Sequence, residues 1–475
     1  MLSAPADLIG HVMSPIVVIL FTVIVAVLFY LGRAPERHTS MALWIPVTWM
    51  LIVGSREVSV WLHASHGGKV AARYTEGNPI DAAAYGVLML AGLLVLNFRS
   101  RKVAGFFSKN GALLLFLAFC LISVLWSDFP FVALKRWVKG IGSIVMVLVI
   151  LTDSEPLEAT KRFFARVAFI LLPLSALLIL FDPALGSEYD PITGITYFIG
   201  VTTQKNALGL TSMVCGLGTL WLFLCAYEER SGRERARHLI AYGTILLTAL
   251  WLIRKCDSMT SFSCLVIAGT VMIVTTNRWV SVHSKNVHLL VAGAIAVAVF
   301  AAFIDESGGL LHLLGRNATL TGRTDIWKAV LFLNPNPFFG TGYESFWLGN
   351  RLQRVWEIIG YRGVAEAHNG YLETYINLGW AGLAMLVVLL ASGYRHAVTA
   401  LRSNPYAGRL SIAFFTASVI FNLSEAGFKM MSPLWIAFIL EITVVPVVLL
   451  HRNSQLAFEA PATREKTPRQ FRVLQ

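Results

Sequence analysis

The sequence predicts an all-α, polytopic integral membrane protein, and three observations support that class. Of its 475 residues, 56% are hydrophobic and only 14% are charged, whereas soluble domains carry about 45–50% and about 25%. Apolar runs long enough to cross a bilayer, which takes about 20 residues, recur along the chain. The 29 Phe, 13 Trp and 13 Tyr exclude a disordered chain. An ordinary soluble enzyme is therefore excluded.

Apolar runs separated by polar breaks predict about 12–13 transmembrane helices. In chain order they are 15–32, 41–57, 81–98, 111–127, 137–152, 164–182, 206–226, 239–254, 258–276, 287–304, 370–392, 409–423 and 433–450. The lower number applies if either 41–57 or 258–276 does not cross. The chain then divides into helices 1–10 in residues 1–304, a long loop at 305–369, helices 11–13 in residues 370–450 and a tail at 451–475.

Loop charge sets the predicted orientation, because cytoplasmic loops are enriched in Lys and Arg. The most basic short loops span 99–109 and 230–237. Placing both in the cytoplasm gives an external N-terminus, a cytoplasmic C-terminal tail and an external 305–369 loop. That loop is rich in Trp, Phe and Leu, which favours a folded, functional segment over disorder.

Several cations fall on the outer face, against this rule. They are Lys135, Arg136, Lys139, Lys205, Arg254, Lys255, Arg316, Arg323 and Lys328. Cations at membrane depth are costly, and a guanidinium suits phosphate through paired hydrogen bonds. We interpret the set as an anion site; the alternative is snorkelling side chains at helix ends. The formal net charge of +12 is then explained by topology and this site, and no nucleic-acid partner is expected.

Within the long loop, Thr321 or Thr324 is predicted to cap a helix that runs to Leu333 and ends before Asn334-Pro335. Arg323 then lies in the first turn. A helix N-terminus already favours anions, so an Arg at that place supports phosphate binding.

His368-Asn369 closes the loop directly before an apolar helix. Asn369 is a predicted N-cap, which leaves His368 outside the helix as a candidate general base; the alternative is an interfacial histidine without a chemical role. Glu425 lies at another outer helix end. Two interpretations are open for it: a carboxylate that orients an Arg or His, or a solvated acid without such a role. The sequence has no phosphate loop, no DxD pair and no Cys/His cluster, so neither a metal site nor a cofactor is predicted.

These motifs together resemble the O-antigen ligase/polymerase superfamily, in particular its exopolysaccharide-polymerase branch. The main matches are 314–327, 340–346 and 367–369, with support from 42–46, 54–56, 126–128 with Arg136, and Gly200 with Lys205-Asn206. The resemblance spans about residues 40–445.

The resemblance implies a multi-pass glycosyltransferase of the bacterial inner membrane, active on its periplasmic face in exopolysaccharide biosynthesis. Such enzymes move a glycan from undecaprenyl pyrophosphate to a glycan or lipid-linked acceptor, without a metal, and export or chain-length-control proteins are possible partners. The implied pyrophosphate ligands are Arg316, Arg323, Arg136 and Lys205, with Lys139 and Arg254 as additional candidates. His368 is the implied base, supported by Asn369, Asn206, Glu425 and Trp327. Relatives carry a cation where this chain has Met259, so another cation compensates or the match at that run is out of register.

Polymerisation of lipid-linked repeat units is the function we predict. A ligase that delivers finished glycan to a lipid A core or to protein uses the same donor chemistry and stays open as an alternative. A flippase or transporter is the alternative from another class, but it predicts charges at the bilayer midplane instead of at one face.

Overall fold

The computed structural model describes residues 13–33, 39–64, 77–190, 194–228, 232–303 and 321–443. Three predictions lie outside these ranges: the role of Arg316, the end of the last span at 444–450, and the tail at 451–475.

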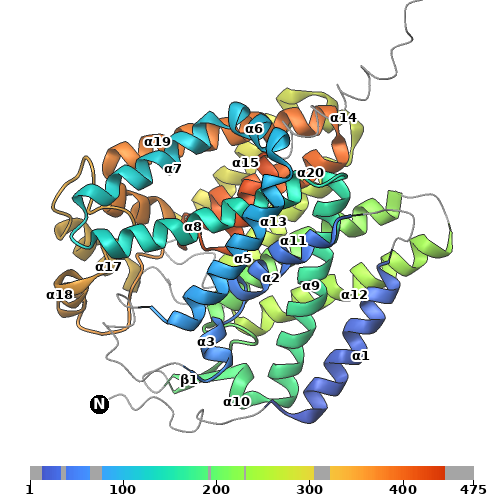
Figure 1. The fold of residues 1–475 in the computed structure, drawn as a ribbon, viewed down its shortest axis with the longest axis horizontal. Helices are drawn as coiled ribbons and strands as arrows, with labels where there is room; N and C mark the ends of the chain where they lie inside the picture. Colours follow the sequence, from blue (N-terminus) through green and yellow to red (C-terminus); the bar gives the residue numbers. More distant parts are fainter. Residues whose placement is uncertain are drawn as a thin grey trace, which may run out of the picture.

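Helix is present in every predicted transmembrane range (Figure 1). In the first half of the chain these helices are α1 (Pro15–Leu31), η2 (Met41–Leu43) with α2 (Trp44–Val53), α5 (Pro79–Asn97), α7 (Gly111–Ile122) with η3 (Ser123–Trp126), α8 (Pro130–Leu151), α9 (Pro156–Phe181) and α11 (Lys205–Glu228). In the second half they are α12 (Arg233–Cys256), α13 (Met259–Val274), α15 (Ser284–Phe303), α19 (Gly370–Ser403), α20 (Pro405–Phe421) and a helix over Pro433–Thr443. Short helices α3 (Val58–Trp61), α10 (Pro183–Gly186) and α14 (Arg278–Val282) lie between them.

Among the described residues, 6 helices are long and apolar enough to cross a membrane, and a bent pair over Ser100–Lys109 and Gly111–Trp126 makes a possible seventh. Shorter apolar helices accompany them, including α1, α13 and α20. The all-α polytopic class is therefore confirmed. The number of spans and the division of the chain into membrane, loop and tail stay predictions.

Residues with specific backbone preferences mark where the helices begin. Pro15, Pro79, Pro130, Pro156 and Pro405 each stand at the start of a helix, where the fixed φ suits the first turn and the missing N–H costs nothing. Asparagine side chains cap four of the described helices, each accepting a hydrogen bond from a backbone N–H of the first turn; they are Asn78, Asn277, Asn369 and Asn404.

Two segments differ from the prediction. The basic stretch at 99–109, expected as a loop, contains helix α6 (Ser100–Lys109). Arg99 and Lys102 explain its position, since they donate hydrogen bonds to the Val149 carbonyl (3.0 Å) and the Thr152 carbonyl (3.1 Å) at the C-terminus of α8, where a helix favours cations. The second difference is an antiparallel hairpin of β1 (Ser187–Asp190) and β2 (Ile195–Phe198) between α10 and α11.

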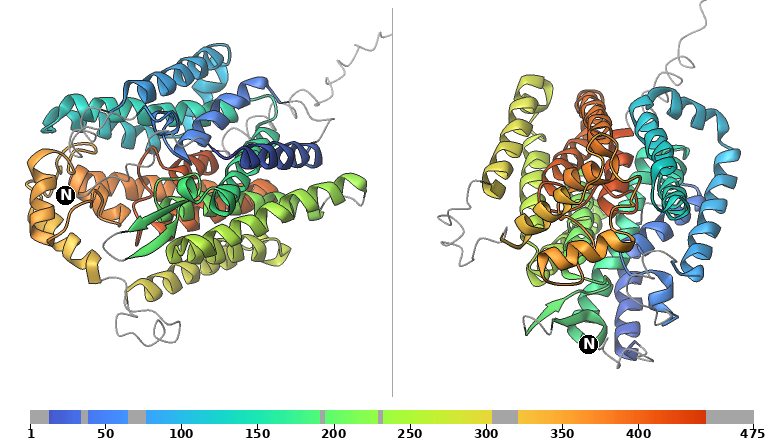
Figure 2. Two further views of the ribbon diagram at one scale, coloured as in Figure 1. Left: turned by 90° about the horizontal axis from the view of Figure 1, so that it is seen from below. Right: turned by 90° about the vertical axis from the view of Figure 1, so that its left-hand side faces the viewer.

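The described part of the long loop, 321–369, folds as a cap at one end of the helical bundle (Figures 1 and 2). It contains α17 (Thr321–Phe332) and α18 (Gly349–Ile359). The predicted end of this helix before Asn334 is confirmed. The predicted N-cap is not, because Thr321 is the first residue of α17 and Thr324 lies within its first turn, so neither precedes the helix. A second apolar core joins both helices to the start of α19 through Val330, Val355 and Ile376.

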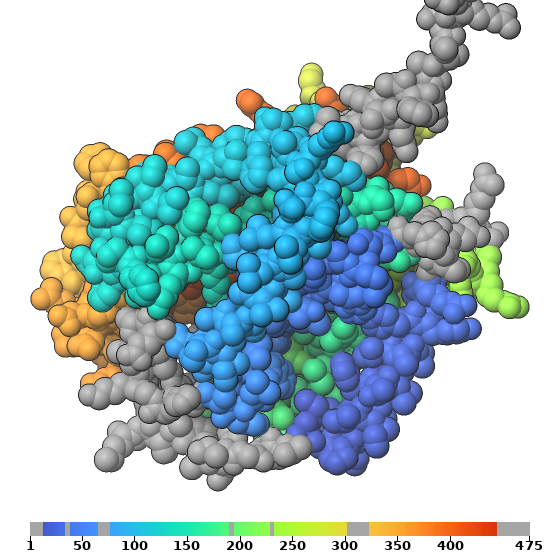
Figure 3. Space-filling model, viewed as in Figure 1, coloured from blue at the N-terminus to red at the C-terminus, as the bar shows by residue number. Residues whose placement is uncertain are grey.

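A kink in α19 fixes the cap against the bundle. Gly379 has φ +65°, and a Cβ there would lie 2.2 Å from the carbonyl carbon of Phe338, so only glycine fits. The next two amides donate hydrogen bonds to loop carbonyls, Trp380 to Pro337 (2.9 Å) and Ala381 to Phe338 (3.1 Å). In the space-filling view the cap residues lie at one edge of a face that is otherwise covered by the first part of the chain (Figure 3).

Candidate active site

Glu425 is the centre of a buried polar cluster in the segment after α20. Its exposed fraction is only 6%. Its carboxylate accepts hydrogen bonds from Arg323 (Nη2 to Oε1, 2.7 Å), Asn206 (Nδ2 to Oε1, 3.2 Å) and His368 (Nδ1 to Oε2, 3.0 Å). Arg323 also donates to the Ser424 carbonyl. Residues predicted separately as anion ligand, base and supporting groups thus meet at one carboxylate.

The cluster lies where the N-terminal ends of four helices converge. Asn206 is the second residue of α11, Arg323 is in the first turn of α17, and His368 precedes the Asn369 cap of α19. Thr260, the second residue of α13, shares a hydrogen bond with the Ser424 hydroxyl (3.0 Å). Helix N-termini carry partial positive charge and available N–H groups, so their convergence favours an anion at this place.

His368 is held in a strained backbone conformation. Its φ is +48°, a value that non-glycine residues adopt rarely and mainly at functional sites. Asn369 fixes the following turn, because its Oδ1 accepts the Leu372 amide (2.9 Å) and its Nδ2 donates to the Leu423 carbonyl (3.0 Å). The predicted N-cap is confirmed. Since Nδ1 of His368 contacts Glu425, Nε2 is the ring nitrogen for a substrate.

A second carboxylate and a lysine extend the cluster. Glu366 Oε1 lies 3.3 Å from His368 Nδ1, and Lys429 Nζ lies 2.8 Å from Glu366 Oε2. Burial lowers the pKa of His368, but the hydrogen bond that His368 donates to Glu425 and the charges of both carboxylates outweigh this and raise that pKa above 6.5. Burial likewise raises the pKa of Glu366, yet Lys429 and His368 bring it below its ordinary value. At neutral pH the Glu366–Lys429 pair is therefore charged.

The ligand atoms of Glu366, His368 and Glu425 lie within 4.8 Å of one another, close enough to hold a metal ion. Each carboxylate already faces a cation, however: Lys429 at Glu366 and Arg323 at Glu425. A divalent ion would have to displace or stand beside these two positive charges, which is unfavourable at such distances. The donor set fits a closed ion-pair network better than a metal.

Trp327 fixes the backbone directly before His368, since its Nε1 donates a hydrogen bond to the Ala367 carbonyl (2.8 Å). Lys205, next to Asn206, lies over the Tyr197 ring of β2 at 4.0 Å. Arg254 is exposed at the last turn of α12. Met259 is 40% exposed at the start of α13, beside Thr260, which places the Ser258–Thr260 run at the border of the cluster.

The two predicted ligands on α8 lie elsewhere. Arg136 donates a hydrogen bond to the Glu344 backbone carbonyl. Lys139 pairs with Glu57 at 3.2 Å and lies over the Tyr85 ring at 4.2 Å. The structure therefore brings together Arg323, His368, Asn206, Glu425, Asn369 and Trp327, whereas Arg136 and Lys139 occupy separate surroundings.

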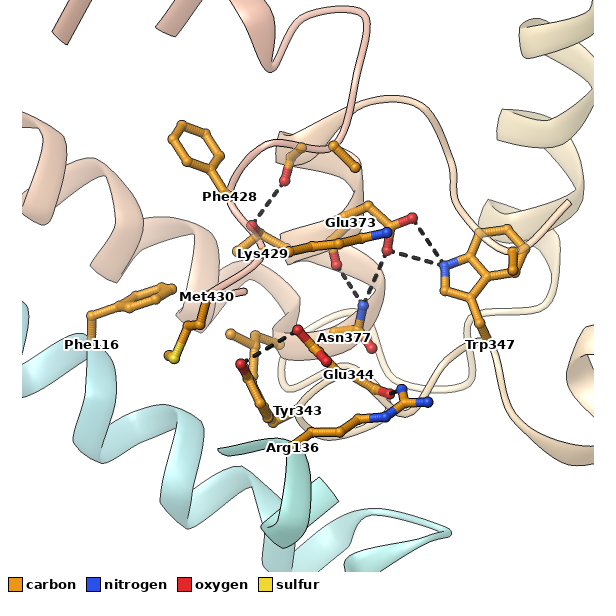
Figure 4. Close-up of a pocket in the computed structure, with 15 residues that line it drawn as sticks. Phe116, Arg136, Tyr343, Glu344, Trp347, Glu373, Asn377, Phe428, Lys429 and Met430 are labelled. Atoms are coloured by element: carbon orange, nitrogen blue, oxygen red, sulfur yellow. Dashed lines mark hydrogen bonds between the residues drawn. The ribbon is translucent and has the colours of Figure 1, made fainter. Parts of the chain in front are cut away.

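A cavity of about 260 Å³ adjoins the cluster (Figure 4). Lys429 lines it as well as binding Glu366, and Gly370, the residue after Asn369, also lines it. Glu366 and Lys429 were not predicted as site residues, because two single charges 63 residues apart carry no local pattern. Glu344 was not predicted either, although this residue belongs to the 340–346 motif.

Comparison with known proteins agrees with the motifs. The O-antigen ligase family model matches residues 213–387, which include Arg323 and His368. The chain is 23% identical over 378 residues to the exopolysaccharide production protein ExoQ of Rhizobium meliloti (strain 1021), covering 78% of this chain and 84% of that protein. No solved structure matches the chain significantly. The chain is therefore similar to the O-antigen ligase family over residues 213–387, and to an exopolysaccharide production protein over most of its length.

Proposed function

We propose that the protein polymerises undecaprenyl-pyrophosphate-linked oligosaccharide repeat units into exopolysaccharide on the periplasmic face of the bacterial inner membrane, with its C-terminus in the cytoplasm. One observation carries the proposal: Arg323 and His368 share the Glu425 carboxylate at the converging starts of four helices. This arrangement combines an anion site with a candidate base. Similarity to the exopolysaccharide production protein of Rhizobium meliloti supports polysaccharide production as the setting.

In the proposed reaction, an acceptor sugar hydroxyl attacks the anomeric carbon of the lipid-linked glycan. The new bond forms between that hydroxyl oxygen and the anomeric carbon, and the bond from the anomeric carbon to the phosphate oxygen breaks. Its electron pair stays on the pyrophosphate. His368 Nε2 accepts the hydroxyl proton, while Nδ1 keeps its own proton and donates it in a hydrogen bond to Glu425. This hydrogen bond fixes the tautomer and stabilises the imidazolium that forms.

Arg323 and the helix N-termini stabilise the charge that develops on the leaving pyrophosphate. Arg323 is suited to this task because Glu425 and the Ser424 carbonyl fix its guanidinium, while 22% of its side chain stays exposed. The remaining proposed pyrophosphate ligands are Arg316, Lys205 and Arg254; Arg136 and Lys139 are no longer assigned to the pyrophosphate, because their contacts lie elsewhere. Since these cations supply the positive charge, we propose transfer without a metal ion.

The test replaces His368 and Arg323 by alanine in the native host and analyses lipid-linked intermediates and polymer. We expect loss of long chains and accumulation of single repeat units on the carrier. The sequence grouped Lys328 with the outer-face cations, but in the structure its side chain is 81% exposed and lies 4.0 Å from Asp325 on the same helix as Arg323. Lys328 is therefore not among the proposed ligands, and Lys328→Ala is the matched control. Full-length polymer left on the carrier would instead indicate the ligase alternative. An unchanged glycan profile in both variants would show that the site assignment is wrong.

A further inference from the structure

The cavity beside the cluster has the size of a small-molecule site. Its volume of about 260 Å³ is many times the space that one water needs and approaches the roughly 300 Å³ lower end of ligand pockets. It is formed by α7, α8, the 343–347 turn, the first two turns of α19 and segment 426–430. In Figure 4, Arg136 enters from α8 on the side opposite Lys429.

The groups that line the cavity mix acceptors, donors and aromatic rings. Carboxylates come from Glu344 and Glu373, cations from Arg136 and Lys429, and a ring from Trp347. Lys429 is neutralised by Glu366. Arg136 offsets only one of the two lining carboxylates, so the lining has no excess of positive charge and suits a neutral ligand with many hydroxyls better than a phosphate.

Most of these groups are fixed before a ligand binds. Glu373 accepts hydrogen bonds from Trp347 Nε1 (3.0 Å to each oxygen) and from the Ala367 amide (2.6 Å). Asn377 Oδ1 accepts the Ser345 amide at 2.9 Å, which fixes the turn that carries Glu344. Such preorganisation reduces the entropy lost on binding.

Glu344 is the group best placed to contact the ligand. Its φ is +45°, so it shares with His368 a left-handed backbone that is rare for a side chain of this kind. Its backbone carbonyl accepts a hydrogen bond from Arg136. Its carboxylate accepts a hydrogen bond from the Tyr343 hydroxyl at 3.4 Å. This distance is longer than an ordinary hydrogen bond between two oxygens, so the carboxylate can accept stronger ones from a ligand.

We propose that this cavity binds one sugar residue of the glycan substrate, with the Glu344 carboxylate accepting hydrogen bonds from its hydroxyls. The assignment rests on the proposed function and deepens it by adding a saccharide site separate from the Arg323–His368 anion site. Lys429 and Glu366 link the two sites, because Glu366 contacts Lys429 with one oxygen and His368 with the other.

The test uses the full-length protein in lipid nanodiscs and a probe that lacks pyrophosphate. The probe is the oligosaccharide repeat unit of the host, released from its lipid carrier by mild acid. Binding is measured by saturation-transfer NMR and titration. We expect the wild type to bind, Glu344→Ala to weaken binding at least tenfold, and Glu344→Gln, which keeps one acceptor oxygen, to weaken it less.

Two further variants separate the cavity from the anion site. Ala426→Leu adds bulk to the cavity wall without removing a polar group, and we expect it also to weaken binding at least tenfold. Arg323→Ala should bind the oligosaccharide within twofold of the wild type. Thermal unfolding of each variant identifies any that fail to fold.

The proposal is overturned if the wild type does not bind the oligosaccharide, or if Glu344→Ala binds it as tightly as the wild type. It is equally overturned if Arg323→Ala abolishes binding, because the sugar would then depend on the anion site. Failure of the proposed function looks different: the glycan profile of the host stays unchanged in Arg323→Ala and His368→Ala, whatever the binding data show.

Discussion

Replacing Glu425 by glutamine removes one charge and leaves the shape of the side chain. The Glu425 carboxylate holds His368 Nδ1 at 3.0 Å and Arg323 Nη2 at 2.7 Å, and only 8% of the Glu425 side chain is exposed. A glutamine amide can donate to Nδ1 as well as accept from it, so the tautomer with Nε2 as acceptor is no longer enforced. The variant therefore weakens the contacts that hold both the base, His368, and the anion ligand, Arg323.

The expected size of the effect follows from these contacts. A single pair of unit charges is worth about 4 kcal/mol at 4 Å in surroundings with an effective dielectric of about 20. Removing one partner of a buried pair typically costs about 3–5 kcal/mol of stability, and glutamine keeps one acceptor for Arg323, so we expect about 3 kcal/mol. Loss of the oriented base should lower the transfer rate by about 10²–10⁴-fold.

The pH dependence has a definite sign. A base works in its deprotonated form, so transfer by the wild type should rise with pH through the pKa of His368, which its carboxylate neighbours hold above 6.5 although burial opposes this. Glu425→Gln removes the largest of the interactions that raise this pKa. The acid limb of the rate profile should therefore move to lower pH, even though the maximal rate falls.

The assay is polymer formation by purified protein from isolated lipid-linked repeat units, measured across pH, together with thermal unfolding. Glu228→Gln is the matched control, because Glu228 pairs with Arg409 at 2.6 Å near the other end of α11, about 33 Å from Asn206 at 1.5 Å per residue. Glu228→Gln should lower the stability of the protein without moving the acid limb of the pH–rate profile. A Glu425→Gln enzyme with wild-type rate and an unmoved acid limb would refute this role of Glu425.

Three further predictions test parts of the site. Arg323→Lys keeps the charge but cannot bind Glu425 and the Ser424 carbonyl together. The apparent affinity for the lipid-linked donor should therefore fall about tenfold or more in a kinetic titration. An unchanged affinity would show that these two contacts of the guanidinium do not matter for donor binding. Asn369→Ala and the control Asn404→Ala should each lower the free energy of unfolding by about 1 kcal/mol, because each asparagine caps a helix. Only Asn369→Ala, which lies beside His368, should slow transfer. Equal effects of both variants on transfer would show that Asn369 does not position His368. A chelator should leave the rate unchanged, since Arg323 and Lys429 already balance the carboxylates; a loss restored by added divalent cation would show that a metal takes part.

The sequence predicted the membrane helices well because long apolar runs and their caps are local signals. The end of α17 before Asn334 and the Asn369 cap of α19 were predicted from residue type and neighbours alone, whereas the capping role given to Thr321 or Thr324 was wrong because α17 already includes both. Glu425 was recognised as a possible partner of an Arg or His, but its contacts with Arg323 and His368 join residues more than 50 positions apart. Such tertiary pairings leave no pattern in a single sequence.

Other features were missed for the same physical reason. The basic stretch at 99–109 resembles a cytoplasmic loop by charge, yet its cations bind the C-terminal carbonyls of α8 and the chain forms α6. The strained backbones of Glu344 and His368 depend on packing of the cap against α19 and the segment after α20. Arg136 was grouped with the anion ligands by charge, whereas the structure places it at the cavity.

The central claim is that Arg323 and His368, joined through Glu425, carry out glycan transfer from a lipid pyrophosphate. Its most direct test follows product from purified wild-type protein, Arg323→Ala, His368→Ala and the control Lys328→Ala, with isolated lipid-linked repeat units as the only substrate. We expect wild type and Lys328→Ala to form polymer and to release the lipid pyrophosphate at the same time, whereas both site variants should do neither. Polymer at the wild-type rate from Arg323→Ala or His368→Ala would contradict the claim.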